Sequence, residues 1–453
     1  NIVLANWQRN CIFALCDIEK DKELPTNIIK RLRMKIYNRQ IHTERANLLR
    51  IMLSRLMTCV GIFAVIGFLC PFSAKAQSGV LPVMHIDTDG GVEITSKEEY
   101  IGASYWIKPN GHDVAEGFGT QESPLRTEIK GRGNFTWTLD KKPYKLKLED
   151  KLPLFGMPKN KHWALMRYNE SNTIGLLMGD FIGMAWTAHQ YPVEVVLNGS
   201  YIGLYELAET NRIGSNRVDI WEQPNENEDP ETVSGGWLVE IDNYTDPCQI
   251  TVEEPTGPMW VTYHSPDVLS ELQEEWLKGS MQALCDAVYD SDKAHSKWED
   301  MLDVESIARY FIVSEVMDYQ DAFDGSFYLH RDLGEGCKWV AGPLWDISCM
   351  QRYKTDYTFR MEGTYAFKTH LIRGLINDPE FCDAVKTVWE EFYPKKAKEW
   401  LAKATEWFNF PEALECDYER WEIESRPSQQ DRIAWLCRVL NRNLEWFDNH
   451  LPS

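Results

Sequence analysis

Short runs of hydrophobic residues, several of them alternating with polar ones, occupy the first half of the chain and are typical of β-strands. Within Pro143–Leu148 the apolar side chains alternate with Lys145 and Lys147, so both lysines project from the same face of the predicted strand. Four other runs predict further strands: Leu81–Ile86, Tyr100–Ile107, Leu125–Lys130 and Gly235–Ile241.

An Asn-Gly pair interrupts a stretch rich in β-forming residues. Asn198-Gly199 separates Val193–Leu197 from Tyr201–Tyr205. A type I′ turn needs positive φ at both central residues, and Asn followed by Gly satisfies this need best. The pattern therefore predicts a tight hairpin across Val193–Leu207.

The second half of the chain shows the three- and four-residue spacing of amphipathic helices. Asp303 is a predicted N-cap for a helix with an apolar face, which consists of Ile307, Tyr310, Val313 and Met317. Another apolar stripe closes the chain and consists of Ile433, Leu436, Leu440, Leu444, Phe447 and Leu451. Ile174–Trp186 is a further predicted helix. The pattern favours an α+β fold with a strand-rich first lobe and a helix-rich second lobe.

A short apolar run near the N-terminus has the three parts of a secretory signal peptide. Val60–Leu69 is apolar, Arg50 and Arg55 precede it, and Ala74-Lys75-Ala76 ends it with alternating small residues. The run is too short to span a bilayer, which needs about 20 apolar residues. We predict a signal peptide at residues 57–76 and a non-native or disordered leader at residues 1–56. The protein is then secreted, periplasmic or at the cell surface, without stable membrane insertion.

The excess of acidic residues limits which kinds of molecule the protein is expected to bind. Residues 77–453 carry 64 Asp and Glu against 36 Lys and Arg. Such a surface repels nucleic acid, because phosphate binding depends on cationic side chains, and it attracts basic substrates or divalent metals. Solubility alone is the simpler explanation of the charge. Seven cysteines remain in this part without a C-x-x-C pair or zinc-site spacing, so we expect buried unpaired thiols and no structural metal.

Two aspartates near the ends of successive strands are candidates for chemistry. Asp321 precedes the predicted strand Phe327–His330, and Asp346 ends the next apolar run. In phosphoryl transfer one acid accepts the proton of the substrate hydroxyl and another binds the metal ion that neutralises the phosphates. Ser326 lies five positions after Asp321, where kinases place a second metal ligand. Acids at strand ends are common, so the pattern alone does not decide the function.

Five sequence blocks occur in a defined order. They are Ile129–Trp137 (IKGRGNFTW), Lys141–Lys147 (KKPYKLK), Val193–Tyr205, Gly235–Asp242 and Gly342–Asp346. Together they resemble the motifs of the spore coat protein H (CotH) kinase-like family. The resemblance implies a divergent minimal protein-kinase-like fold, with an N-terminal strand extension at residues 77–110, an N-lobe at about residues 111–210 and a C-lobe at about residues 235–451.

The resemblance also implies the roles of the site residues. Asp321 is the expected catalytic aspartate, and Asp346 and Ser326 are the expected metal ligands. The expected nucleotide-binding residues are Lys147 as first choice, Lys145, Arg132 and Glu209. ATP with Mg²⁺ or Mn²⁺ is the implied cofactor, and serine or threonine of a protein is the implied acceptor. Arg132 could equally bind phosphate or pair with an internal carboxylate.

Two departures from the family pattern leave a second hypothesis open. Ser348 stands where the family commonly has another acid, and the stretch Asn169–Thr173 lacks an expected basic residue. The alternative is therefore a catalytically impaired pseudokinase that acts as a protein- or glycan-binding module at the cell surface. Hydrolase motifs such as G-x-S-x-G and H-E-x-x-H do not occur in the sequence.

Overall fold

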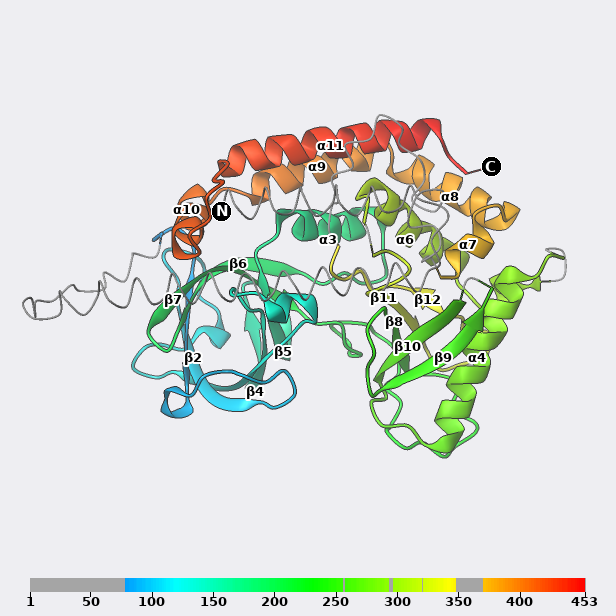
Figure 1. Cartoon of the computed structure of the whole chain (residues 1–453), viewed down its shortest axis with the longest axis horizontal. Coiled ribbons are helices and arrows are strands. Elements are labelled where there is room, and N and C mark those ends of the chain that lie inside the picture. The colour runs from blue at the N-terminus through cyan, green and yellow to red at the C-terminus, as the bar shows by residue number, and fades with distance from the viewer. Residues whose placement is uncertain (1–77, 256, 293–295, 320, 348–369, 453) are drawn as a thin grey trace, which may run out of the picture. The chain divides into compact units, whose positions relative to one another are not determined.

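The computed structural model describes residues 78–452, with gaps at residue 256, residues 293–295, residue 320 and residues 348–369. The predicted leader (residues 1–56), the predicted signal peptide (residues 57–76) and Ser348 lie outside the described residues. The described chain combines helices with two β-sheets, which confirms the mixed α and β content predicted from the sequence (Figure 1).

The first sheet is a closed barrel with the strand order β1-β2-β3-β4-β5-β7-β6, and a parallel pairing of β1 with β6 closes it. Its strands are β1 (Val83–Thr88), β2 (Ile101–Lys108), β3 (Leu125–Gly131), β4 (Tyr144–Leu154), β5 (Met157–Arg167), β6 (Gln190–Leu197) and β7 (Ser200–Glu209). The predicted strand extension at residues 77–110 supplies β1 and β2. The predicted hairpin is confirmed as β6–β7, with positive φ at Asn198 (49°) and Gly199 (74°).

The second sheet has five strands in the order β12-β11-β8-β10-β9. They are β8 (Trp237–Ile241), β9 (Gln249–Glu254), β10 (Gly257–Ser265), β11 (Phe327–Arg331) and β12 (Val340–Ala341). The apolar pattern predicts β8 and β11 but misses β9 and β10. The second half of the chain is therefore not only helical, since it contains a sheet of its own.

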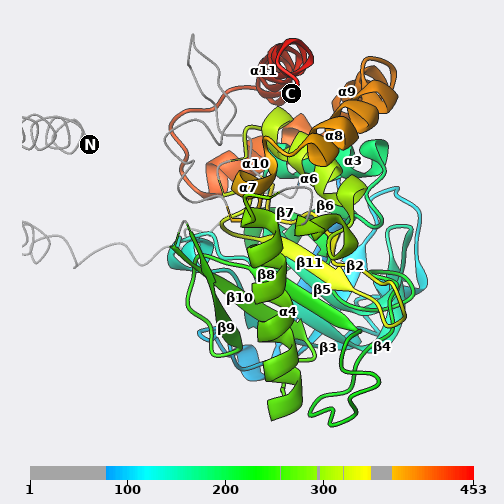
Figure 2. The same cartoon turned by 90° about the vertical axis from the view of Figure 1, so that its right-hand side faces the viewer.

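Most helices lie on one side of the sheets, above them in Figure 1, whereas one long helix runs alongside the second sheet (Figures 1 and 2). The helices are α3 (Glu170–Ile182), α4 (Glu271–Tyr289), α6 (Val304–Val316), α7 (Ile372–Leu375), α8 (Pro379–Phe392), α9 (Lys395–Trp407), α10 (Pro411–Arg420) and α11 (Gln429–Asn449). Asp303 caps α6 as predicted, because its side chain accepts a hydrogen bond from Ser306 N. Five residues of the predicted apolar stripe are buried in α11, whereas Leu451 lies beyond the end of the helix and is only partly buried. None of the helices among the described residues has the length and apolar composition that a bilayer span requires.

Two large hydrophobic cores and a smaller cluster around Ala188, Leu238 and Tyr328 hold these layers together. One large core fills the barrel, where Leu146, Trp163 and Leu207 are completely buried, and the larger one lies between the helices and the second sheet.

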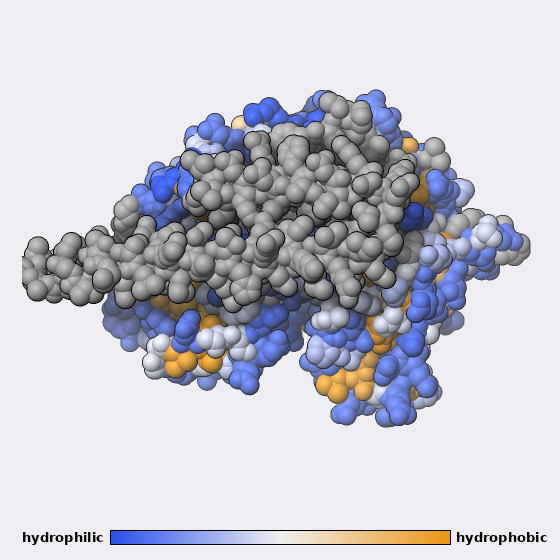
Figure 3. All heavy atoms as spheres, viewed as in Figure 1, coloured by the Kyte–Doolittle hydropathy of each residue, from blue (hydrophilic) through white to orange (hydrophobic). Residues whose placement is uncertain are grey.

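Among the described cysteines, Cys285 on α4 and Cys382 on α8 are buried as expected, whereas the other four are partly exposed: Cys248, Cys337, Cys416 and Cys437. The described surface in the view of Figure 3 is mostly hydrophilic, as the excess of acidic residues leads one to expect.

A buried ion pair attaches α10 to the barrel. Asp417 Oδ1 on α10 accepts hydrogen bonds from Lys141 Nζ at 2.5 Å and from the backbone N–H of Leu204 on β7 at 2.8 Å. Both charged side chains are more than 90% buried. Gly203 has φ of 106°, and a Cβ at this position would overlap Asp417 Oδ1, so glycine is required here.

The Lys141→Met substitution should lower the free energy of unfolding by about 3–5 kcal/mol, because it leaves Asp417 buried without its cation. Urea denaturation of the variant measures this loss. Lys159→Met is the control, since the pair of Lys159 with Glu116 is exposed and contributes about 0–1 kcal/mol. Equal denaturation midpoints for the two variants would contradict the role of the ion pair.

Candidate active site

A cleft of about 750 Å³ lies between the outside of the barrel and the second sheet. Its size is in the range of small-molecule and cofactor sites. The barrel wall of the cleft includes Arg132 and Lys145, and the opposite wall includes Asp321, Ser326 and Asp346. Five residues that were predicted from distant parts of the sequence therefore line one cavity.

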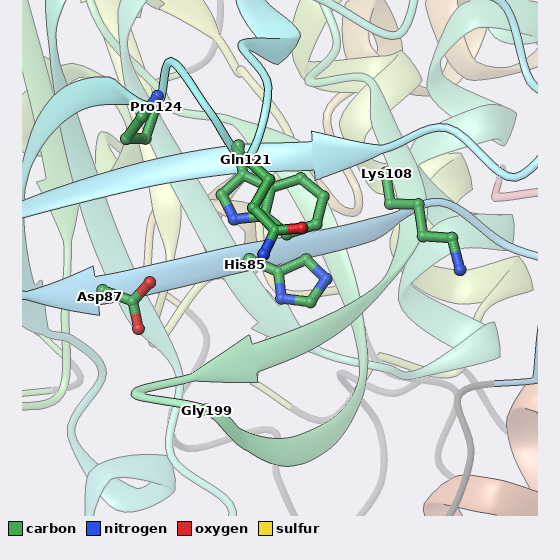
Figure 4. A pocket seen from close by; sticks show the side chains of 7 residues that line it. His85, Asp87, Lys108, Gln121, Pro124 and Gly199 are labelled. Atoms are coloured by element: carbon green, nitrogen blue, oxygen red, sulfur yellow. The ribbon is translucent and has the colours of Figure 1, made fainter.

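A second hollow of about 470 Å³ lies on the outer face of β1 and β2 (Figure 4). His85 stacks on Trp106 there, with 3.9 Å between the ring centroids. Asp87 and Lys108 flank the stacked rings. None of the predicted site residues lines this hollow, so the larger cleft is the candidate active site.

Strand register decides which lysine faces the cleft. Lys145 on β4 pairs with Ala164 on β5, which in turn pairs with Ala208 on β7. Directly paired residues of neighbouring antiparallel strands project from the same face, so these three side chains form a row on the outside of the barrel. Of these three residues Lys145 lines the cleft, whereas Ala164 and Ala208 are covered by other parts of the protein.

Lys145 lies in an environment that disfavours its charge. Burial, with the positive charges of Arg212 and Arg132, lowers the pKa of Lys145 to about 8. A negatively charged ligand in the cleft would offset these effects. Lys147, the first choice of the sequence, instead forms a half-exposed ion pair with Glu128 at 2.9 Å, outside the lining of the cleft.

The glycine-rich turn after β3 holds Arg132 over the cleft. A Cβ at Gly131 would overlap the ring of Trp137, and Gly133 has φ of 81°, so both glycines are required by local geometry. The guanidinium of Arg132 lies 5.2 Å from the ring centroid of Trp345 and contacts Met166 Sδ. Burial lowers the pKa of Arg132, and the negative charge of Asp346 opposes this shift.

The acidic wall of the cleft is built on unusual backbone conformations. Asp321 and Ser326 belong to the loop between α6 and β11, in which Phe323 (65°) and Ser326 (51°) have positive φ. Asp346 follows β12 with φ of 55°. Such conformations cost about 1–3 kcal/mol each and are concentrated at functional sites.

Asp346 faces the solvent of the cleft but is closely surrounded by protein. Burial raises its pKa, the negative charges of Asp321 and Glu240 add to the shift, and Arg132 opposes it. Asp346, Asp321 and Arg132 therefore line the same cleft and lie close enough for their charges to interact.

The end of β8 adds acids that the sequence did not single out. Burial and the neighbouring Glu240 raise the pKa of Asp242 to about 6. Glu240 Oε2 lies 2.6 Å from His264 Nε2. The available signal was alternation, because Trp237, Val239 and Ile241 are in the core and the acids take the other face.

Glu209 does not reach the cleft, although the resemblance suggested a nucleotide-edge position. It pairs with Trp163 on β5, which pairs with Leu146 on β4, so its side chain follows the inner face of the barrel. There it is completely buried and forms an ion pair with Arg217, and His189 Nδ1 lies 2.9 Å from its second oxygen. The next residues, Thr210 and Asn211, line the cleft instead.

A basic residue from a distant part of the chain lies beside the segment Asn169–Thr173, which itself lacks the expected basic residue. Asn169 caps α3 by accepting a hydrogen bond from Ser171 N. Arg432 on α11 lies close by, donates a hydrogen bond to Glu170 Oε2 at 2.5 Å and lines the cleft. A residue more than 250 positions away thus supplies the positive charge at this side of the cleft.

The donor set fits a metal ion that arrives with a phosphate ligand. Among the described residues no group of three or more His, Cys, Asp or Glu side chains is arranged to hold a metal ion by itself. Asp321 and Asp346 are nevertheless two carboxylates in one cleft. Magnesium bound with a nucleotide uses one or two carboxylates and takes its other ligands from phosphate oxygens and water.

The sequence also matches a known protein family. A family model described as CotH kinase protein matches residues 129–447. The chain belongs to the CotH kinase family. The CotH match begins at the end of β3 and ends in α11, so it includes every residue of the cleft walls named above. Comparison with the curated proteins finds no match.

Amine modification should show the lowered pKa of Lys145 directly. With a pKa of about 8, the Lys145 amine is neutral and reactive in half of the protein molecules at pH 8. An ordinary lysine with a pKa of about 10.4 is almost wholly protonated at that pH. Mass spectrometry after brief acetylation across pH 6–11 should give a midpoint near pH 8.

The Arg212→Gln variant should move that midpoint upward, because Arg212 is the strongest of the neighbouring charges that disfavour the ammonium form. A midpoint above pH 10 in the unmodified sequence would contradict the assigned environment of Lys145.

Proposed function

We propose that this CotH family member is a protein kinase that transfers the γ-phosphoryl group of ATP to serine or threonine of a secreted or surface protein, with Mg²⁺ or Mn²⁺. The observation that carries the proposal is the cleft with Lys145 and Arg132 on one wall and Asp321 and Asp346 on the other. In this proposal the barrel is the nucleotide-binding lobe and the second sheet with its helices is the catalytic lobe.

Each charged residue has a defined task in this mechanism. Lys145 and Arg132 bind the phosphate oxygens, and Asp346 with Ser326 holds the metal ion. When bound, the metal ion neutralises charge that develops on the phosphates. Asp321 orients the substrate hydroxyl and accepts its proton. Positioning and electrostatic stabilisation account for most of the rate in such reactions, so correct placement of these groups is the main requirement.

Acids on the wall of the cleft opposite Lys145 favour a basic acceptor protein. Glu240, Asp242 and Asp246 line the cleft together with Asp321 and Asp346. Complementary charge steers a basic segment to the site and raises the association rate. This preference agrees with the excess of acidic residues in residues 77–453.

A binding module without catalysis is the second candidate. Phe135 and Tyr244 line the cleft with 66% and 46% of their surface exposed. Exposed aromatic side chains are typical of surfaces that bind a protein or a glycan. Calorimetry with ATP and Mg²⁺ separates the two candidates, because a binding module of this kind does not require the nucleotide.

Replacement of Asp346 by Ala should reduce phosphate transfer to a basic protein by about 100-fold or more, since it removes a metal-binding charge worth several kcal/mol in the transition state. Transfer of labelled phosphate measures the effect. Asp150→Asn is the control, because Asp150 is an exposed acid on β4 outside the cleft. Equal labelling by the unmodified protein and the Asp346 variant would rule out the proposed kinase mechanism.

ATP affinity should fall as the pH rises above about 8. Phosphate binding needs the ammonium form of Lys145, which is complete below its pKa of about 8 and is lost above it. The expected loss approaches tenfold per pH unit until the pKa of the nucleotide complex is reached.

Calorimetric titrations at pH 7, 8 and 9 test this dependence. In Lys145→Arg the fall between pH 8 and 9 should vanish, because a guanidinium stays charged over this range. An unchanged pH profile in that variant would assign the dependence to another group.

A further inference from the structure

The loop between α6 and β11 has a buried acid on the side that faces away from the cleft. Asp321 and Ser326 of this loop line the cleft, whereas Asp324 does not and is buried. The backbone N–H groups of Asp324 and Gly325 both donate to the carbonyl of Asp321, so these residues form one tight turn. A change in the position of Asp324 therefore moves Asp321 as well.

His370, which precedes α7, contacts this turn at two points. Its backbone N–H donates to the carbonyl of Phe323 at 3.1 Å, and its Nε2 lies 3.9 Å from Asp324 Oδ1. The second distance is too long for a hydrogen bond but short enough for charges to interact. The other oxygen of Asp324 accepts a hydrogen bond from Asn243 Nδ2 at 3.2 Å. Phe323 has positive φ, and such a strained conformation persists only where its surroundings hold it.

A completely buried carboxylate fixes the imidazole ring of His370. Oε2 of Glu254, at the end of β9, lies 2.8 Å from His370 Nδ1. The other oxygen of Glu254 accepts a hydrogen bond from the backbone N–H of Leu371 at 2.9 Å. Because a carboxylate only accepts hydrogen bonds, Nδ1 of His370 donates to Glu254, and this bond leaves Nε2 directed at Asp324.

We infer that His370 is a positioning residue for the proposed reaction. Held by Glu254 on one side and facing Asp324 on the other, it fixes the turn that places Asp321 at the acceptor hydroxyl. This inference rests on the proposed function, in which Asp321 accepts the proton of that hydroxyl. His370 does not line the cleft, so it acts through Asp324 and not on the substrate. Displacement of a catalytic group by about 1 Å can lower the rate roughly 100-fold.

Two single variants of the full-length protein test this role by phosphate transfer from ATP with Mg²⁺ to a basic protein. His370→Asn keeps an amide donor near the position of Nδ1 for Glu254 but removes Nε2, which faces Asp324. Asp324→Ala removes the partner and leaves the pair of His370 with Glu254 intact. Each variant should lower kcat about 10- to 100-fold. The KM for ATP should change by less than about threefold, because Lys145 and Arg132 on the opposite wall are untouched.

The double variant shows whether the two residues act together. Its kcat should lie within about twofold of the lower single variant, whereas independent effects would multiply. His189→Ala is the matched control, because His189 Nδ1 lies 2.9 Å from the completely buried Glu209 but His189 does not line the cleft. The control should retain kcat within about twofold, since its loss leaves the turn at Asp324 unchanged.

Calorimetric titration with ATP counts the folded binding sites of each variant, so that kcat is expressed per site. A kcat per site that is unchanged in either single variant would assign His370 a role in folding alone and overturn the inference. Losses that multiply in the double variant would also overturn it, and both results leave the kinase proposal standing. An unmodified protein that transfers no phosphate overturns the proposed function and the inference together.

Discussion

Side-chain alternation across β4, β5 and β7 is the constraint on which the candidate site depends. One set of paired residues, Leu146, Trp163 and Glu209, fills the inside of the barrel. The neighbouring set, Lys145, Ala164 and Ala208, must then face outward, because successive residues of a strand project from opposite faces. A shift of register by one residue would put the cleft lysine into the apolar core and Glu209 on the outside.

The walls of the cleft hold charges that are destabilised in the free protein. Burial lowers the pKa of Lys145 and raises the pKa values of Asp346 and Asp242. In each case the shift favours the neutral form of the side chain. Each shift reflects burial and neighbouring charges of the same sign. A phosphate group would offset these effects on the barrel wall, and a divalent cation would offset them on the other wall. The positive φ values of Ser326 and Asp346 indicate that the acidic wall is held in place by its surroundings.

The C-terminal helices support the barrel side of this arrangement. Asp417 on α10 joins Lys141 to the backbone of β7, close in sequence to the residues that end β7 in the cleft. Arg432 on α11 pairs with Glu170 at the start of α3 and lines the cleft. The last part of the chain is thus structurally coupled to the site, although the chemistry resides in earlier segments.

Local pattern determined much of this protein. Alternation, the Asn-Gly turn and the helical stripes predicted β4, the β6–β7 hairpin, α6 and α11, because these signals act over a few residues. The sequence motifs also indicated the CotH family. They predicted five site residues that line the cleft: Arg132, Lys145, Asp321, Ser326 and Asp346.

Only the tertiary structure decided between Lys145 and Lys147, turned Glu209 inward, and added Asp242 and Arg432 to the cleft. These outcomes depend on pairing between strands and on contacts between distant segments, and neither is encoded in the spacing of residues along one element. The barrel closed by β1 and β6 is a consequence of the same kind.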